Sequence, residues 1–248
     1  MAYSLARTIA LLLCGKASRR PLAAQEAWFF LHCMKKSSHS RASSRSAARA
    51  GALPHRVRII AGKWRGSRLD FPQSDAIRPT PDRVRETLFN WLSDQVRGAH
   101  CLDLFAGSGA LGFEALSRGA DAVVFVERDP RIVRYLRGTL ERFECERGAV
   151  VLADAWRYLA GRARPFDLVF LDPPFNDHWA ERACRELAQG GWLAPRALVY
   201  LETSLDESPP DLPPGWSLAR HGRAGQVGYH LARAPAPDPP RAANAQRA

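Results

Sequence analysis

The chain has 248 residues, of which 46% are hydrophobic and 25% charged, and a formal net charge of +11 at pH 7. A domain commonly has roughly 100–200 residues, so this length suits one domain with extensions or two small domains, and the composition suits a packed core. Residues 1–54 hold nine Lys and Arg and one acid, which gives +8 there and leaves +3 for the rest of the chain. The folded part is thus only mildly basic, which is compatible with a phosphate-rich partner but does not establish one.

Composition also argues against two classes of protein. No segment reaches the roughly 18 consecutive apolar residues that a membrane span needs. The five cysteines show no C-x-x-C pair and no zinc-like spacing: Cys14, Cys33, Cys101, Cys145 and Cys184. An odd, scattered set of this kind predicts reduced thiols in the cytoplasm and no metal site.

The two ends of the chain differ in composition from its middle. Residues 1–54 are rich in Ala, Ser and Arg and lack a sustained hydrophobic period, which favours a disordered or spurious extension, with Met34 as a natural start. A transit peptide and a basic RNA-binding arm at residues 35–58 are the alternatives. The Ala- and Pro-rich tail, 234–248, is also expected to be disordered.

Order is expected from residue 55, and the first elements form a small N-terminal unit over residues 55–95. Alternating residues at 57–60 and 67–71, with glycines between them, predict a β-hairpin. Thr80 and Pro81 then predict the start of a helix, with Thr80 as its cap and Pro81 in its first turn.

From residue 100 the pattern alternates between strand and helix, which predicts an α/β core over 100–233 and a methyltransferase domain over 55–233 as a whole. Strands are predicted at 100–104, 122–127, 149–152, 167–171 and 197–202, and helices at 109–118, 130–143, 154–160 and 178–190. Such βαβ units give a mostly parallel sheet with helices on both faces. Residues 217–220 and 226–231 predict a closing hairpin.

A glycine-rich turn follows the first strand of this core. Gly107, Gly109 and Gly112 match the G-x-G-x-x-G pattern that brings backbone N–H groups close to a ligand at a helix N-terminus. The pattern alone does not separate NAD from S-adenosylmethionine. Asp103 favours S-adenosylmethionine, because a carboxylate attracts its ammonium and sulfonium charges and repels a pyrophosphate; the alternative is that Asp103 only caps the loop.

Two further acids follow neighbouring strands. Glu127 lies 20 residues after Gly107, where an acid that binds ribose hydroxyls is expected. Asp154 either accepts a hydrogen bond from the adenine amino group or only caps the next helix. The carboxyl ends of parallel strands share one edge of a sheet, so these acids are expected around one ligand.

The apolar run 166–171 ends in Asp172-Pro173-Pro174-Phe175. Proline cannot donate to a strand ladder, so the strand stops here, at the same edge of the sheet. An exocyclic base amine is a poor nucleophile, and hydrogen bonds to Asp172 and to the Pro173 carbonyl would direct its lone pair at a methyl group. Phe175 can stack on the base. The motif therefore predicts transfer of a methyl group to an amino nitrogen.

With these motifs, the chain resembles the RsmD family, bacterial methyltransferases that modify guanine N2 in 16S ribosomal RNA. The resemblance covers about residues 56–232 and rests on 58–62, 78–90, the glycine loop and 170–175. It implies a Rossmann-like, seven-stranded sheet whose last strand is antiparallel, S-adenosylmethionine as cofactor, and 16S rRNA in an assembling 30S subunit as substrate. We expect a monomer.

The resemblance also assigns roles to individual residues. It implies catalytic roles for Asp172, Pro173, Pro174 and Phe175, and RNA or cofactor contacts for Arg78, Arg83 and Arg85. Cofactor contacts are expected at Asp103, Phe105, Ala106, Gly107, Ser108, Gly109, Glu127, Arg128, Asp154 and Ala155. The functional alternatives are a DNA adenine or cytosine amino-methyltransferase and an NAD-binding oxidoreductase.

Overall fold

The computed structural model describes residues 55–72, 80–173, 179–204 and 210–236. Its first elements are the antiparallel hairpin β1 (His55–Arg58) and β2 (Arg68–Phe71), followed by the helix α3 (Asp82–Trp91). The predicted leader at 1–54 and most of the predicted tail lie outside the described residues. None of the helices in the described ranges is both long and apolar enough to cross a membrane.

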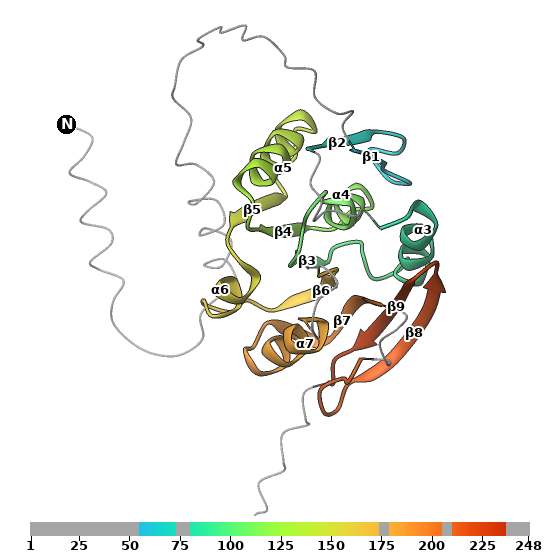
Figure 1. Ribbon diagram of the computed structural model, residues 1–248, viewed down its shortest axis with the longest axis vertical. Helices are drawn as coiled ribbons and strands as arrows, with labels where there is room; N and C mark the ends of the chain where they lie inside the picture. The colour runs from blue at the N-terminus through green and yellow to red at the C-terminus, as the bar shows by residue number, and fades with distance from the viewer. Residues whose placement is uncertain (1–54, 73–79, 174–178, 205–209, 237–248) are drawn as a thin grey trace, which may run out of the picture. The chain divides into compact units, whose positions relative to one another are not determined.

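Strands and helices then alternate along the chain (Figure 1). These elements are β3 (His100–Asp103), α4 (Ala110–Ser117), β4 (Ala122–Glu127), α5 (Pro130–Arg142), β5 (Gly148–Leu152), α6 (Ala155–Leu159), β6 (Phe166–Leu171), α7 (Trp179–Gln189), β7 (Leu193–Ser204), β8 (Ser217–Ala224) and β9 (Val227–Arg233). The strands form a seven-stranded sheet in the order β5-β4-β3-β6-β7-β9-β8. Five neighbouring strands of this sheet are parallel, namely β5, β4, β3, β6 and β7. The strand β9 runs antiparallel to both of its neighbours, which confirms the predicted fold class.

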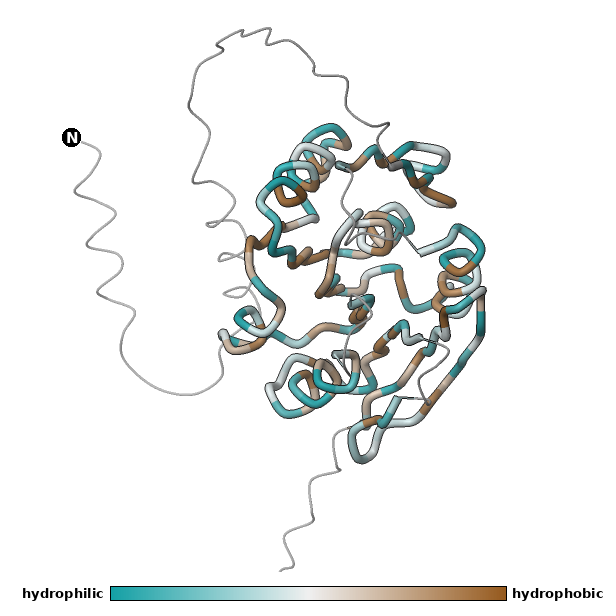
Figure 2. The backbone as a smooth tube through the Cα atoms, in the orientation of Figure 1, coloured by the Kyte–Doolittle hydropathy of each residue, from teal (hydrophilic) through white to brown (hydrophobic). Residues whose placement is uncertain are grey.

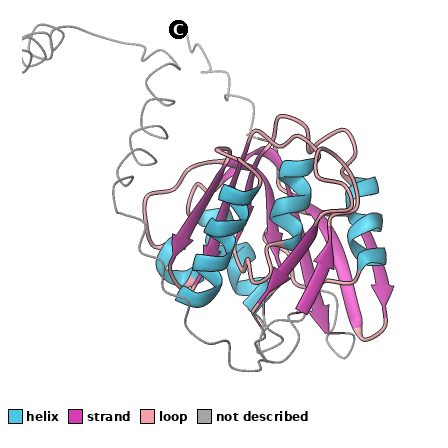
Figure 3. Ribbon diagram, turned by 90° about the horizontal axis from the view of Figure 1, so that it is seen from above, coloured by secondary structure: helices cyan, strands magenta, loops and turns pink. Residues whose placement is uncertain are grey.

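Each face of the sheet has its own hydrophobic core. Alternate strand residues such as Cys101 and Phe125 pack with α3, α4, α5 and the hairpin, and the residues between them, such as Leu102 and Val124, pack with α6 and α7. Figure 1 shows the two sets of helices on opposite sides of the strands, and Figure 3 shows the same layers from above. Hydrophobic residues follow the central strands (Figure 2), as expected for parallel strands buried on both faces.

The predicted elements are found, but several details differ. The strand β1 lies two residues before its predicted range of 57–60, and β8 extends four residues past its predicted end at residue 220. The strand β7 begins at Leu193, four residues before its predicted start, and continues past Arg196, whose φ is +62°. The helix α3 has no side-chain cap: Pro81 is its N-cap residue, and the Thr80 hydroxyl points elsewhere. The prediction that Thr80 caps this helix is therefore wrong.

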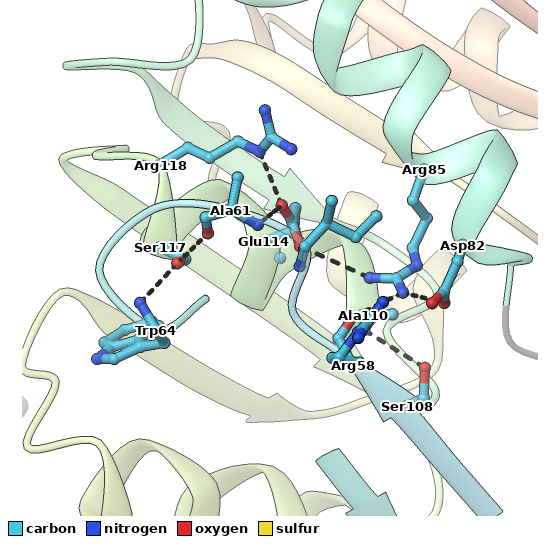
Figure 4. Close-up of polar contacts among 12 residues, drawn as sticks. Arg58, Ala61, Trp64, Asp82, Arg85, Ser108, Ala110, Glu114, Ser117 and Arg118 are labelled. Carbon is cyan, nitrogen blue, oxygen red and sulfur yellow. Dashed lines mark hydrogen bonds and ion pairs between the residues drawn. The ribbon is translucent and has the colours of Figure 1, made fainter. Parts of the chain in front are cut away.

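A buried carboxylate attaches the hairpin unit to the core (Figure 4). Glu114 of α4 is fully buried, and its oxygens accept hydrogen bonds from the backbone N–H groups of Ile60 (2.8 Å) and Ala61 (3.0 Å) and from Arg118 Nε (2.7 Å). Arg85 of α3 lies 3.6 Å from the same carboxylate. The loop after β1, the helix α3 and the helix α4 therefore meet at one charged group.

Candidate active site

The carboxyl ends of β3, β4, β5 and β6 lie at one edge of the sheet, because these strands are parallel neighbours. The glycine loop leaves β3, and Glu127 ends β4. Asp154 and Asp172 follow β5 and β6 by two residues and one residue. Ligands of open α/β sheets bind at this edge, so the topology brings the predicted groups to the expected place.

The glycine loop turns in a conformation that other residues rarely adopt. Gly107 and Gly109 have φ angles of +47° and +73°, and Gly109 forms the N-cap of α4. Gly112 is needed for a different reason, because a Cβ there would lie 2.2 Å from the ring of Phe125 on β4. The loop thus turns tightly into the N-terminus of α4, and this helix packs directly on the sheet.

Asp103 is buried at the end of β3. Its Oδ2 accepts a hydrogen bond from the Gly112 backbone N–H at 3.1 Å, so it does secure the loop, as one interpretation predicted. Burial raises the pKa of this carboxyl group to about 7, the Gly112 hydrogen bond opposes the rise, and the nearby charge of Glu127 adds to it. Ionising a buried carboxyl group costs free energy, and a cation placed beside Asp103 would offset that cost. The group therefore also suits an ammonium ligand.

The two acids on the neighbouring strands hold backbone N–H groups at the same edge. Glu127 accepts hydrogen bonds from Gly107 N (3.0 Å) and Asp129 N (2.8 Å), which links the end of β4 to the glycine loop. Asp154 caps α6 by accepting from Trp156 N at 2.9 Å. A carboxylate oxygen can accept more than one hydrogen bond, so these contacts leave both acids able to bind hydroxyl or amino groups.

The other predicted cofactor residues lie around these acids. Ala106, Ser108 and Ala155 are buried, Phe105 is partly buried, and Arg128 is exposed. The Ser108 hydroxyl accepts from the Ala110 N–H at 3.3 Å, which helps to start α4 (Figure 4).

Sequence reasoning missed an aromatic cluster beside this loop. Phe105 lies 6.2 Å from Trp156 and 6.1 Å from Trp179 between ring centroids, and Arg182 lies 4.0 Å over the Trp156 ring. Trp156 lies in α6, and Trp179 is the first residue of α7, the next helix along the chain. The available signal was their position close to the motifs, two residues after Asp154 and four residues after Phe175.

Asp172 is partly buried, and one side chain in the described part of the chain donates a hydrogen bond to it. Thr80 donates from its hydroxyl to Asp172 Oδ2 at 3.3 Å, across 92 residues of sequence. Burial raises the pKa of Asp172 well above its ordinary value, and the charges of Glu202 and Asp103 raise it further. Pro173 is buried beside it, while Pro174 and Phe175 lie outside the described residues.

A second acid that sequence reasoning missed lies on the adjacent strand. Leu171 pairs with Leu201 in the parallel register of β6 and β7, so Glu202 occupies the position next to Asp172. Glu202 is 4% exposed and accepts a hydrogen bond from the Tyr200 hydroxyl at 2.8 Å. A single acid inside a strand carries no recognisable motif, so only the sheet register reveals it.

The three arginines predicted to meet RNA have different surroundings. Arg83 is exposed on α3, and Arg78 lies outside the described residues. Arg85 is fully buried and donates to the Arg58 carbonyl (2.8 Å) and to Asp82 (2.6 Å), beside Glu114. The expectation that Arg85 flanks the site as a surface group does not fit this position, because the side chain connects the hairpin, α3 and α4 inside the protein.

The site contains acids, a glycine loop and aromatic rings, and among the described residues no group of His, Cys, Asp and Glu could hold a metal ion. Asp103 is a buried carboxylate without an ion-pair partner among the described residues, and Glu127 ends β4 and Asp154 follows β5 at the same edge of the sheet. These groups fit a ligand with a positive charge, hydroxyl groups and an amino group, which S-adenosylmethionine carries.

Comparisons with known proteins agree with this geometry. The family model described as "Conserved hypothetical protein 95" matches residues 57–233. Ribosomal RNA small subunit methyltransferase D of Escherichia coli (strain K12) is 46% identical over 175 residues, which cover 71% of this chain and 88% of the relative. The protein of the same name from Haemophilus influenzae is 46% identical over 179 residues, 71% of this chain and 92% of the relative.

Solved structures show the same relationship. The Escherichia coli protein yhhF is 43% identical with a TM-score of 0.69, and the match covers 73% of this chain and 99% of that chain. The Haemophilus influenzae protein HI0767 is 42% identical with a TM-score of 0.64 and the same two coverages. These similarities show a methyltransferase, which agrees with S-adenosylmethionine as the cofactor predicted from the glycine loop and Asp103, and the interpretation as an NAD-binding oxidoreductase is set aside. The chain belongs to the RsmD family of methyltransferases.

Proposed function

We propose that this protein transfers a methyl group from S-adenosylmethionine to the exocyclic N2 of a guanine in the 16S rRNA of the small ribosomal subunit. The observation that carries the proposal is the placement of Asp172 and Pro173 at the end of β6, beside the glycine loop and Asp103. This arrangement puts an acceptor for an amino group next to a cradle for a cationic cofactor.

The residues of the site have separate tasks in this reaction. The cofactor supplies a methyl group bound to a positively charged sulfur. Asp103 would hold the ammonium group, Glu127 the ribose hydroxyls and Asp154 the adenine amino group. Asp172 and the Pro173 carbonyl would accept the two N–H groups of the base amine, so that the nitrogen lone pair points at the methyl carbon. After transfer the nitrogen is cationic, and Asp172 or water takes its proton.

The choice of RNA rests on the relatives, whose names specify ribosomal RNA of the small subunit. The exposed Arg83 on α3 is a candidate for phosphate contact, because α3 begins two residues after Thr80, which touches Asp172. We propose the assembling small subunit as partner, a monomeric enzyme and a cytoplasmic location. The guanine N2 specificity comes from the family resemblance, since the site chemistry would suit other base amines.

Two experiments test the proposal. Mass spectrometry of rRNA nucleosides from a deletion strain should show loss of N2-methylguanosine, and its undiminished presence would overturn the rRNA assignment. Loss of methyladenine or methylcytosine from DNA instead would favour the DNA amino-methyltransferase alternative.

In vitro, Asp172→Ala should reduce methyl transfer by about 10²-fold or more, because the amine loses its acceptor. Calorimetry should show that S-adenosylhomocysteine still binds this variant. Retained transfer would remove Asp172 from its catalytic role, and lost binding would show that the substitution disturbs the cofactor site instead.

A further inference from the structure

An aromatic cluster lies beside the proposed active site, at the carboxyl edge of the sheet. Its members are Phe105, Trp156 and Trp179, and each belongs to the segment that follows a different parallel strand, β3, β5 or β6. The two indole rings meet at an angle of 79°, with their centroids 5.6 Å apart. The cluster therefore joins the segment that carries the glycine loop to the segments that follow Asp154 and Asp172.

A third tryptophan, Trp192, packs in the core that α6 and α7 cover, and it differs from the two in the cluster. Trp192 is 2% exposed and donates its indole N–H to the Leu159 carbonyl at 3.2 Å. Trp156 and Trp179 are only partly buried, and neither indole N–H forms a hydrogen bond with another described residue. A buried tryptophan usually has its N–H bonded, so the two rings of the cluster have the surroundings of a contact surface.

An arginine adds positive charge to this cluster. Arg182 lies three residues after Trp179 in α7, and its guanidinium carbon is 4.0 Å from the centroid of the Trp156 ring. The side chain is exposed and forms no ion pair in the described part of the chain. The preceding acid, Glu181, accepts a hydrogen bond from the Asp211 backbone N–H at 3.3 Å. A guanidinium stacked on a ring still has N–H groups that can bind a phosphate.

We propose that Trp179 and Arg182 bind an unpaired nucleotide of the substrate RNA close to the target base, with its base on the aromatic cluster and its phosphate on Arg182. The inference rests on the proposed function, since it names a contact of that substrate outside the reacting group. Charge favours RNA over the cofactor at this surface. S-adenosylmethionine is cationic and has no phosphate, so an exposed arginine suits it poorly, whereas RNA brings a phosphate with every base.

Such a contact would help the target base to reach the site. An exocyclic amine within a stacked segment cannot enter a protein pocket, so the base has to leave its stack. The neighbouring base then loses a stacking partner, and an aromatic surface can replace it. The contact would stabilise the open form of the RNA and so lower KM, without taking part in the chemical step.

The test is steady-state methylation of small ribosomal subunits purified from the deletion strain, with cofactor saturating. Trp179→Leu keeps an apolar side chain in the cluster but removes the ring, and it should raise KM for the subunits about tenfold. Trp179→Phe keeps a ring and should restore KM to within about threefold of the wild type. In both variants kcat should stay within about twofold of the wild type, because the lost contact is the same in the ground state and the transition state.

Arg182→Gln tests the phosphate contact at an exposed position. It should raise KM about fivefold and weaken its salt dependence, since one phosphate contact on a single strand contributes about 0.7 to the slope of log affinity against log salt concentration. The matched control is Arg185→Gln, one turn further along α7. It removes the same charge from an exposed arginine that has no ring contact among the described residues, and it should leave KM and the salt slope unchanged.

Affinity for S-adenosylhomocysteine, measured by calorimetry, should be the same in all variants. A loss of this affinity in Trp179→Leu would assign the cluster to the cofactor and overturn the proposal. An unchanged KM in Arg182→Gln, or an equal rise in Arg185→Gln, would also overturn it, and this comparison decides alone if Trp179→Leu does not fold. Failure of the wild-type protein to methylate the subunits would instead overturn the proposed function.

Discussion

Glu114 is a buried acid and Asp172 a partly buried one, and the two differ in the hydrogen-bond donors around them. Glu114 receives two backbone N–H groups and the Arg118 side chain within hydrogen-bond distance, with Arg85 nearby at 3.6 Å. Among the described residues, Asp172 receives one hydroxyl at 3.3 Å. The described part of the protein therefore supplies more partners to Glu114 than to Asp172.

The same contrast holds for the neighbours of Asp172 at the carboxyl edge of the sheet. In the described residues, neither Asp103 nor Glu202 takes part in an ion pair, and the pKa of each is raised, chiefly by burial. A buried acid with several internal donors and a nearby arginine stabilises the fold, whereas one with a single neutral donor suits a ligand that brings an ammonium or an amine. The comparison thus separates a structural cluster from a functional one by the donors and cations that the described residues supply.

The largest expected effect tests the structural cluster. Glu114→Ala should lower the free energy of unfolding by about 3–5 kcal/mol, because it leaves Arg85 as a buried charge with fewer partners and frees two backbone N–H groups. Urea denaturation measures this. The matched control is Asp70→Ala, which breaks the exposed ion pair with Arg56 and should cost about 1 kcal/mol or less. Equal losses in the two variants would refute the structural role of Glu114.

The second largest effect is the pH dependence of the free energy of unfolding that Asp103 causes. The pKa of Asp103 is about 7 in the folded protein and about 4 when unfolded, so the folded state holds a proton that the unfolded state has lost between these values. The stabilising contribution of Asp103 to the free energy of unfolding is therefore complete below pH 4 and disappears as the pH rises through about 7. Between pH 5 and pH 8 the wild type should lose about 2 kcal/mol relative to Asp103→Asn.

Parallel denaturation series of the two proteins at several pH values measure this difference. Asn keeps an oxygen that can accept from the Gly112 N–H, so the variant preserves the loop contact. A difference between the two proteins that does not change with pH would show that Asp103 is ionised throughout and that its charge is compensated.

How far the sequence predicted this molecule depends on the range of the interactions. The sheet, its helices and the positions of Asp103, Glu127, Asp154 and Asp172 followed from periodicity and from local motifs, because each motif directly follows its own strand. The antiparallel last strand came from the family resemblance. The strands, the helices and the motifs depend on residues that are close together in the chain.

The remaining features depend on contacts between distant residues. Thr80 has the sequence context of a helix cap, and its contact with Asp172 spans 92 residues. Arg85 belongs to an arginine-rich helix, and its burial depends on the distant Glu114. Glu202 becomes visible only through the register of β6 and β7. Local propensity cannot report which partner a polar side chain finds across the fold, so these roles had to come from the structure.

The smallest expected effect tests whether Asp103 binds the positive charge of the cofactor. Only the ionised carboxylate attracts an ammonium group, and its pKa of about 7 means that protonation competes with binding in the neutral range. Affinity for S-adenosylhomocysteine should therefore fall by about tenfold, or about 1.4 kcal/mol, from pH 7.5 to pH 6. Calorimetry at each pH measures this, with Asp103→Asn as the control that binds more weakly and shows no such dependence. A wild-type affinity that stays constant over this range would mean that Asp103 only secures the glycine loop through Gly112, and the comparison with Glu114 would then place Asp103 among the structural acids.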